Sequence, residues 1–440
     1  MDKLVIEGGR AMRGVLPVSG SKNTALPLMA AALLAEGKTT LHNIPVLQDV
    51  WTFSNVLRVS GAEVEFDPDD DPTTPETLTI DATRITHPEA PYDLVKKMRA
   101  SFYMLGALLG RCGKARVSLP GGCAWGPRPV DLHMKGMEAL GATLTLDKGY
   151  VVAEAPGGRL RGAEITFEPS SVGATINVML AAVRAEGTTV LHNAAAEPDV
   201  VVFGQMLQAM GAQIDGLGTT TVTIEGVETL SPVEFSNCPD RIELGTYMLL
   251  AGMTVPEGET VTLTNADPEH LGDAFLDAFR ATGIPFDVNG DTITVTGPSS
   301  IHPVSIETAP YPGFPTDLQA QWTVLMTQAT GNSEIVDTIY TDRFKHVPEL
   351  RRLGANAFVI GNKVAVEGGT PLSSAVVMST DLRASVSLVM AGLIAEGTTD
   401  VLRVYHLDRG YERLEAKLQA VGLAVTREEY DENAVEAELA

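Results

Sequence analysis

Runs of apolar residues at helical spacing recur along this chain, each followed by a glycine turn and then by a segment in which apolar and polar residues alternate. Apolar residues three and four apart predict an amphipathic or buried helix, and strict alternation predicts a strand. Three copies of this pattern are clear, at 28–44, 178–194 and 388–404, and three are weaker, at 102–119, 247–266 and 323–339. Self-similarity of this kind predicts an architecture built from repeated units.

The turn glycines give the period of the repeat. They lie 76, 74, 71, 73 and 66 residues apart, at Gly37, Gly113, Gly187, Gly258, Gly331 and Gly397. Each copy therefore spans about one sixth of the 440 residues.

Each unit continues with a second amphipathic run that ends at a glycine, the usual left-handed stop of a helix, and leads into another alternating segment. These second runs cover 50–66, 132–146, 201–214, 275–288, 347–360 and 411–425. A further short strand is expected at TLTIDA, YVVAEA, TVTIEG, TITVTG and KVAVEG. The pattern predicts an α/β fold of six helix–strand–helix–strand units of about 70 residues, which divide naturally into two domains of three.

Composition places the chain among ordinary globular proteins, with 44% hydrophobic and 20% charged residues. No run reaches the 18 or so apolar residues of a membrane span. The first ten residues read as a strand and not as a signal peptide, and three cysteines make a disulfide framework implausible. We therefore expect a cytoplasmic protein.

The net charge of −24 argues against nucleic acid or an anionic membrane as partner, because both require a basic face. An anionic substrate must then meet a local basic pocket. The acidic stretch 427–440 is expected to be a solvated tail. The eight histidines show no metal-ligand spacing, so we expect no metal, and no obligatory protein partner is evident.

The segment Leu119–Leu132, LPGGCAWGPRPVDL, carries the most chemistry per residue. Its glycines and prolines exclude a regular helix or strand, so it predicts a shaped loop that holds the thiol of Cys123 near the guanidinium of Arg128. The alternative is a surface turn in which the cysteine is incidental.

Four stretches together resemble the UDP-N-acetylglucosamine enolpyruvyl transferases: the opening LVIEGGRAMRGVLPVSGSKNTALPLMAAALLAEG, the loop PGGCAWGPRPVDLHMKGMEALGA, TAPYPGFPTDLQAQ, and MSTDLRASVSLVMAGLIAEGTT followed by YHLDRGYERLEAKL. The resemblance covers nearly the whole chain. It implies two inside-out α/β barrel domains of three repeats each, over 22–237 and over 1–21 with 238–440, the first strand crossing to the second domain.

The same resemblance implies a reaction. The family transfers the enolpyruvyl group of phosphoenolpyruvate to the 3-hydroxyl of UDP-N-acetylglucosamine and releases phosphate, in the first committed step of peptidoglycan synthesis. It uses no metal or other cofactor.

The resemblance assigns catalytic roles to Cys123, Asp317, Lys22 and Arg409. Phosphoenolpyruvate carries two anionic groups, so fixed cations should bind it, and the residues implied are Lys22, Asn23, Arg128 and Arg409. Arg383 is a further candidate anion ligand, unless Asp381 simply pairs with it.

Asp317 matches the residue that takes the proton of the sugar hydroxyl, although Thr-Asp before an apolar run is also a common helix N-cap. Cys123 matches a cysteine that adds covalently to phosphoenolpyruvate and acts as general acid or in product release. Cys112 and Cys238 lie outside the matched motifs and read as small apolar fillers.

For the nucleotide sugar, the resemblance implies contacts with Asn23, Arg99, Arg128, Pro129, Val130, Asp131, Leu132, Ser171, Val172, Gly173, Asp317 and Ile339. Ser171–Gly173 should open a helix whose N–H groups face the diphosphate. Pro169 stands where some relatives carry lysine, which removes one expected diphosphate contact. His133 also matches a family position, although a histidine at a helix start is more often structural.

Two other functions compete with this one. The sister enzyme of the shikimate pathway has the same fold and uses shikimate 3-phosphate as acceptor, but the PGGC loop, GSKN and RPVDL speak against it. A non-catalytic nucleotide-sugar-binding paralogue would not need Lys22, Arg99, Cys123, Asp317 and Arg409 together.

Overall fold

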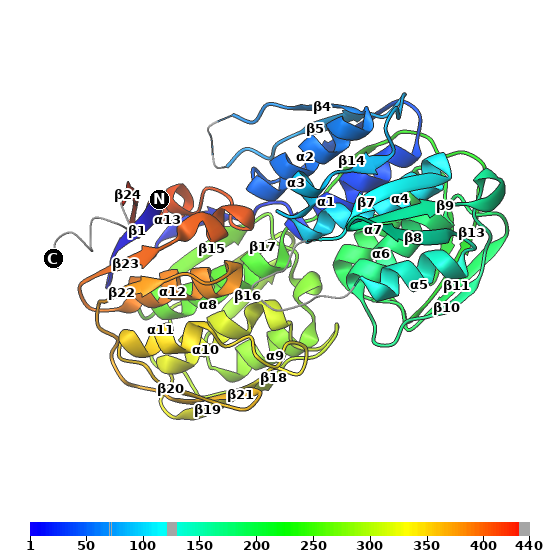
Figure 1. Cartoon of the computed structure of the whole chain (residues 1–440). Helices are drawn as coiled ribbons and strands as arrows, with labels where there is room; N and C mark the ends of the chain where they lie inside the picture. Colours follow the sequence, from blue (N-terminus) through cyan, green and yellow to red (C-terminus); the bar gives the residue numbers. More distant parts are fainter. Residues whose placement is uncertain (70, 72, 121–129, 431–440) are drawn as a thin grey trace. The chain divides into compact units, whose positions relative to one another are not determined.

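The computed structural model describes residues 1–69, 71, 73–120 and 130–430. Contacts divide the chain into two compact units, Gly20–Cys238 and Met1–Ser19 with Pro239–Ala440 (Figure 1). No helix within the described ranges is long and apolar enough to cross a membrane.

In the unit Gly20–Cys238, the described strands form three four-stranded sheets with one common order. A short edge strand pairs in parallel with the first long strand, and the other two pairings are antiparallel. The sheets are β14(Glu234–Ser236)-β3(Lys38–His42)-β5(Leu78–Asp81)-β4(Glu63–Phe66), β6(Glu89–Ala90)-β7(Lys114–Ser118)-β9(Tyr150–Glu154)-β8(Thr143–Asp147), and β10(Glu164–Thr166)-β11(Thr188–His192)-β13(Thr221–Glu225)-β12(Gln213–Asp215).

The helices of this unit are of two kinds. Three are apolar on nearly every side and pack on one another in the core: α1 (Lys22–Ala31), α4 (Met104–Cys112) and α6 (Val172–Ala182). Gly106 permits the close approach of α4 to α6, because a Cβ there would lie 2.0 Å from the carbonyl oxygen of Asn177. The amphipathic helices are α2 (Gln48–Ser60), α5 (Asp131–Ala139) and α7 (Pro198–Ala209), and the short helical segments are η1 (Ala32–Leu34), α3 (Tyr92–Val95), η2 (Arg99–Tyr103) and η3 (Pro156–Gly158).

The second unit repeats this plan. Its sheets are β2(Gly14–Pro17)-β15(Thr260–Thr264)-β17(Thr292–Thr296)-β16(Phe286–Asn289), β18(Ile306–Glu307)-β19(Asn332–Val336)-β21(Lys363–Glu367)-β20(Asn356–Ile360), and β22(Val376–Met378)-β23(Thr398–Leu402)-β1(Asp2–Glu7)-β24(Ala424–Glu429). The buried helices are α8 (Arg241–Thr254), α10 (Gln319–Thr327) and α12 (Leu382–Ile394), which contact one another (Figure 1). The outer helices are α9 (Asp273–Ala281), α11 (His346–Arg352) and α13 (Leu414–Ala420), with the 3₁₀ segments η4 (Pro268–Leu271), η5 (Thr316–Leu318) and η6 (Val404–Arg409).

The α/β class and the six helix–strand–helix–strand units are confirmed, with buried helices inside and sheets outside. The sequence showed five short strands for six units. The sixth is β1, whose KLVIEG resembles KVAVEG of β21 and which lies between β23 and β24. The N-terminal strand thus completes the last repeat of the chain.

The stretch 427–440 is not wholly a tail. Arg427–Glu429 belong to β24 and pair with β1 in antiparallel register. Arg427 forms ion pairs with Asp2, Asp408 and Glu415. The acidic composition of this stretch gave no sign of the strand, which pairs with the N-terminal β1 and forms ion pairs with residues near both ends of the chain.

Candidate active site

Lys22 is the first residue of α1, as the sequence predicted for a lysine placed directly before an apolar run. The helix starts here because the side chain of Ser21 accepts a hydrogen bond from Thr24 N at 3.2 Å, an N-cap. The ammonium of Lys22 lies 3.5 Å from Asp49 Oδ2, and only 14% of its side chain is exposed. Asn23 follows on the same turn and is half-buried.

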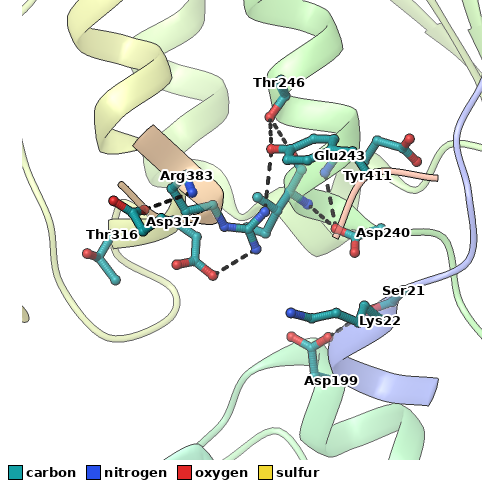
Figure 2. A network of polar contacts seen from close by, with 12 residues as sticks. Ser21, Lys22, Asp199, Asp240, Glu243, Thr246, Thr316, Asp317, Arg383 and Tyr411 are labelled. Carbon is teal, nitrogen blue, oxygen red and sulfur yellow. Dashed lines mark hydrogen bonds and ion pairs between the residues drawn. The ribbon is translucent and has the colours of Figure 1, made fainter. Parts of the chain in front are cut away.

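Asp199, in the first turn of α7, fixes the start of α1. Its Oδ1 accepts hydrogen bonds from Ser21 Oγ at 3.0 Å and from Thr24 Oγ1 at 2.8 Å (Figure 2). The carboxylate is 5% exposed. Nothing in the spacing of the sequence pointed to Asp199, because its partners lie far away along the chain.

The start of α6 matches its prediction. Ser171 is the N-cap and accepts a hydrogen bond from Ala174 N at 3.3 Å, so that Val172 and Gly173 form the first turn. Unpaired N–H groups of a first turn favour a bound anion. Pro169 is exposed just before this turn.

His133 packs against this turn from α5. A Cβ on Gly173 would lie 3.3 Å from His133 Nε2, and the ring is 4% exposed. Asn177 Nδ2 lies 2.9 Å from His133 Nδ1 and also donates to Phe102 O at 3.0 Å, while its Oδ1 accepts from Gly106 N. Because the amide can only donate to the ring, His133 carries its proton on Nε2.

Burial, helped by the positive charge of Arg99, lowers the pKa of His133 to about 3. The imidazole is therefore neutral near pH 7. Arg99, at the start of η2, is half-buried and close enough for its charge to act on His133.

The end of the segment Leu119–Leu132 leads into α5. Val130 is buried, Asp131 lies in the first turn with its carboxylate 3.7 Å from the ammonium of Lys135, and Leu132 packs against the core. Cys123, Arg128 and Pro129 lie outside the described residues.

Asp317, in the unit that contains α10, is held by two arginines. Its Oδ1 lies 2.7 Å from Arg343 Nη1 and its Oδ2 lies 3.1 Å from Arg383 Nη2. The side chain of each arginine is 7% exposed, whereas the Asp317 side chain is 28% exposed. Asp317 lies inside η5 and does not cap α10, so the N-cap interpretation is wrong.

Burial alone would raise the pKa of Asp317, but the charges of Arg383 and Arg343 outweigh burial and hold the pKa well below its usual range. This carboxylate is ionised at any physiological pH. It is a weak base for as long as both guanidiniums remain on it.

Arg383 comes from the first turn of α12 and does not pair with Asp381. The carboxylate of Asp381 instead caps α12 by accepting from Arg383 N at 2.9 Å and Ala384 N at 3.0 Å. The guanidinium of Arg383 lies between Asp317 and the hydroxyl of Tyr411, 3.4 Å away, and Tyr411 in turn lies 2.9 Å from Thr246 Oγ1 (Figure 2).

Ile339 lies in the turn after β19 and is 36% exposed. Arg409 ends η6, where it is half-buried and its charge lowers the pKa of His406, an effect secondary to burial. The structure thus brings Asp317 and Arg383 into contact and adds Arg343 and Tyr411, which the sequence had not indicated as site residues.

The chain matches known proteins over most of its length. Residues 6–418 match the family described as EPSP synthase (3-phosphoshikimate 1-carboxyvinyltransferase). UDP-N-acetylglucosamine 1-carboxyvinyltransferase of Chloroherpeton thalassium is 54% identical over 433 residues, which cover 98% of both chains. The protein of the same name from Chlorobaculum parvum is also 54% identical, over 98% of this chain and 100% of its own.

Solved structures agree. The enolpyruvyl transferase NikO from Streptomyces tendae superposes with a TM-score of 0.87 at 27% identity, over 98% of this chain and 99% of its own. EPSP synthase from Acinetobacter baumannii, at 18% identity and a TM-score of 0.74, shares the fold over 98% of this chain and 100% of its own. The chain therefore belongs to the EPSP synthase family of enolpyruvyl transferases.

Proposed function

We propose that this protein transfers the enolpyruvyl group of phosphoenolpyruvate to the 3-hydroxyl of UDP-N-acetylglucosamine, with release of phosphate, in the first committed step of peptidoglycan synthesis. The observation that carries the proposal is the 54% identity, over 98% of both chains, to a protein named UDP-N-acetylglucosamine 1-carboxyvinyltransferase.

The reaction is an addition followed by an elimination. The 3-hydroxyl oxygen bonds to C2 of phosphoenolpyruvate and loses its proton, while C3 gains a proton. C3 then loses a proton as the bond from C2 to the phosphate oxygen breaks, which restores the double bond. One group must accept the hydroxyl proton and another must protonate C3.

We assign the first role to Asp317. Cys123 is assigned to the same reaction as the general acid that protonates C3, as the nucleophile of a covalent intermediate, or as a group that assists product release. Lys22, Asn23, Arg128 and Arg409 are assigned to phosphoenolpyruvate. The low exposure of Lys22 and its place at the start of α1 support its part, because a partly desolvated cation beside helix N–H groups binds anions strongly.

The two guanidiniums on Asp317 impose an order on the chemistry. A carboxylate held at low pKa accepts a proton poorly, so Asp317 becomes an effective base only after guanidinium charge is shared with another anion. Phosphoenolpyruvate is such an anion. We infer that its binding precedes deprotonation of the sugar hydroxyl.

The nucleotide sugar is assigned to the start of α6 (Ser171, Val172 and Gly173), to Asn23 and Arg99, to Arg128–Leu132, and to Asp317 and Ile339. The helix start at Ser171 supports this assignment, because the N–H groups of a first helical turn favour a bound anion.

A phosphate-release assay tests the proposal. With phosphoenolpyruvate present, UDP-N-acetylglucosamine should support continuous release, whereas shikimate 3-phosphate, the acceptor implied by the name of the matching family, should not. Release with shikimate 3-phosphate alone would reassign the protein to the sister reaction, and release with neither acceptor would indicate a non-catalytic binder.

A further inference from the structure

Asp337 is a fully buried carboxylate directly after β19. Its Oδ1 accepts hydrogen bonds from Thr308 Oγ1 at 2.8 Å, Ile339 N at 3.0 Å and Tyr340 N at 2.9 Å. Its Oδ2 accepts one from Thr316 Oγ1 at 2.7 Å. Four donors thus converge on this one side chain.

The contact with Thr316 leads to Asp317. The Thr316 hydroxyl donates its one hydrogen bond to Asp337. A lone pair of the same oxygen therefore remains to accept a hydrogen bond from Arg343 Nη1 at 3.1 Å. The same Nη1 lies 2.7 Å from Asp317 Oδ1. Thr316 directly precedes Asp317, and Figure 2 shows the two side chains next to each other. Asp337 therefore sets the direction of the hydroxyl that helps to place Arg343 on Asp317.

The contacts with Ile339 N and Tyr340 N fix the turn that presents Ile339. The carboxylate accepts from the backbone two and three residues ahead, which is the geometry of an Asx turn. One side chain thus connects the turn of Ile339 to the segment of Asp317.

We propose that Asp337 is a positioning residue for the enolpyruvyl transfer: through Thr316 and Arg343 it holds Asp317 in register with the turn of Ile339, so that both meet the same acceptor sugar. This inference rests on the proposed function. A purely structural Asp337 would stabilise the turn and leave the chemistry of Asp317 unaffected.

Two threonines that donate to the same carboxylate separate these roles. Thr316→Val removes the hydroxyl on the path to Asp317 and keeps the three contacts to Oδ1. Thr308→Val is the matched control, because it removes a buried donor to Asp337 and also an acceptor for Thr338 N, but has no contact with Arg343. Thr316→Ser keeps the hydroxyl. Asp337→Asn places an NH₂ group, which cannot accept, opposite Thr316.

The pH profile reports on Asp317 because the charges that hold its pKa down are those of Arg383 and Arg343. Other titratable groups lie in this region: Tyr340 lies under the Arg343 guanidinium, the charge of Asp240 acts on Arg383, and Tyr411 and His346 are buried nearby. Tyr411 has its pKa raised by burial, and burial lowers the pKa of His346 to about 3, so both are neutral near pH 7. Loosening Arg343 raises the pKa of Asp317 and moves the acid limb of kcat/KM to higher pH.

The test measures kcat, KM for UDP-N-acetylglucosamine and the pH profile of kcat/KM for wild type and the four variants, together with urea unfolding. We expect Thr316→Val and Asp337→Asn each to lower kcat about tenfold, the effect of one lost charge-assisted hydrogen bond. The misplacement of Asp317 outweighs the basicity that it gains when Arg343 loosens, because proton transfer depends first on geometry. Both variants should also move the acid limb to higher pH. The double variant should be no worse than either single one, because both break the same path. Thr316→Ser should restore wild-type values, and Thr308→Val should lower stability without moving kcat or the acid limb.

Equal kcat values and equal pH profiles for Thr316→Val and Thr308→Val, with an active wild type, would overturn the role of Asp337 and leave the proposed function standing. A wild type that releases no phosphate with UDP-N-acetylglucosamine would overturn the proposed function and this inference with it.

Discussion

Arg343 Nη1 lies 2.7 Å from Asp317 Oδ1, and this ion pair couples the stability of its unit to the residue proposed as base. The carboxylate also faces Arg383, so it contacts two arginines whose side chains are each 7% exposed. Removing one partner of a buried ion pair lowers the free energy of unfolding more than replacing both partners by apolar residues, because the remaining charge stays desolvated.

Asp317→Asn should therefore destabilise the protein by roughly 3 kcal/mol and reduce turnover by about 10²- to 10⁴-fold, the usual contribution of a general base. The exposed pair of Asp277 and Arg280, 2.8 Å apart, provides the control, and Asp277→Asn should change little. Urea unfolding and steady-state kinetics measure the two effects.

The same pair predicts a pH dependence. The folded pKa of Asp317 lies below the unfolded value near 4, so its contribution is complete above about pH 4 and is lost as the pH falls further. Below pH 4 the wild type should lose stability more steeply than Asp317→Asn. Parallel curves for the two proteins would contradict the assigned ion pairs.

A second buried pair should matter for folding alone. Lys417 Nζ lies 3.2 Å from Glu243 Oε1, and both side chains are 2% exposed. Lys417→Met leaves Glu243 without this cation and should cost about 3–5 kcal/mol. The double variant Lys417→Met with Glu243→Leu should lose less than the sum of the single losses, as a thermodynamic cycle of urea unfolding would show. Additive losses would mean that the two groups do not interact.

Glu259→Gln is the control for that cycle. It breaks the exposed pair of Glu259 with Arg13, 2.6 Å apart, and should leave the unfolding free energy nearly unchanged.

Two buried histidines should make the protein acid-sensitive in a higher pH range than the carboxylates do. Burial lowers the pKa of His133 and of His346 to about 3, helped by the charges of Arg99 and Arg343. Unfolded histidine titrates near 6.5, so below that pH the unfolded chain binds more protons, and stability falls as the pH is lowered toward 3. The slope should approach about 1.4 kcal/mol per pH unit for each histidine.

Urea unfolding between about pH 7 and pH 5 measures this slope. His346→Phe should remove the contribution of one histidine to it, because the variant has one group fewer that takes up a proton on unfolding. A stability that does not change over this range would show that neither histidine is neutral because of burial. Nitrogen NMR should independently find His133 protonated on Nε2.

Cys123 should be the thiol that an epoxide inhibitor alkylates. Fosfomycin modifies the matching cysteine of the family, and burial raises the pKa of Cys112, which keeps that thiol protonated and slow to react. Peptide mass analysis should find the adduct at Cys123 and neither at Cys112 nor at Cys238. Cys123→Asp should keep measurable turnover and lose the inhibition, because a carboxylic acid can donate a proton and is not alkylated in the same way. Sensitivity retained by this variant would refute the assignment.

The sequence predicted the repeated fold because each unit carries strong local signals. The apolar runs of α6 and α12, the glycine stops and the alternating strands are visible within windows of about 15 residues. The parallel edge strands such as β6 and β18 were missed, since two residues have no measurable period. The pairing of β1 with β24 was not visible either, because it joins opposite ends of the chain.

The site was predictable only through motifs. Asp317 and Arg383 each stand in a recognisable stretch, but the sequence could not show that they meet, nor that Arg343 joins them. Asp199 and Asp337 resemble ordinary acidic residues at the start of a helix or after a strand. Their importance appears only in their burial and in the donors that converge on them.

The identity of the product tests the central claim most directly. Purified protein is incubated with phosphoenolpyruvate and UDP-N-acetylglucosamine, and the nucleotide sugar is recovered for proton and carbon NMR. We predict a vinyl ether whose carbon connectivity places the enolpyruvyl group on O3 of the sugar, formed in equal amount to the phosphate released. Recovery of unmodified nucleotide sugar, or the same group found instead on shikimate 3-phosphate when both acceptors are present, would contradict the account.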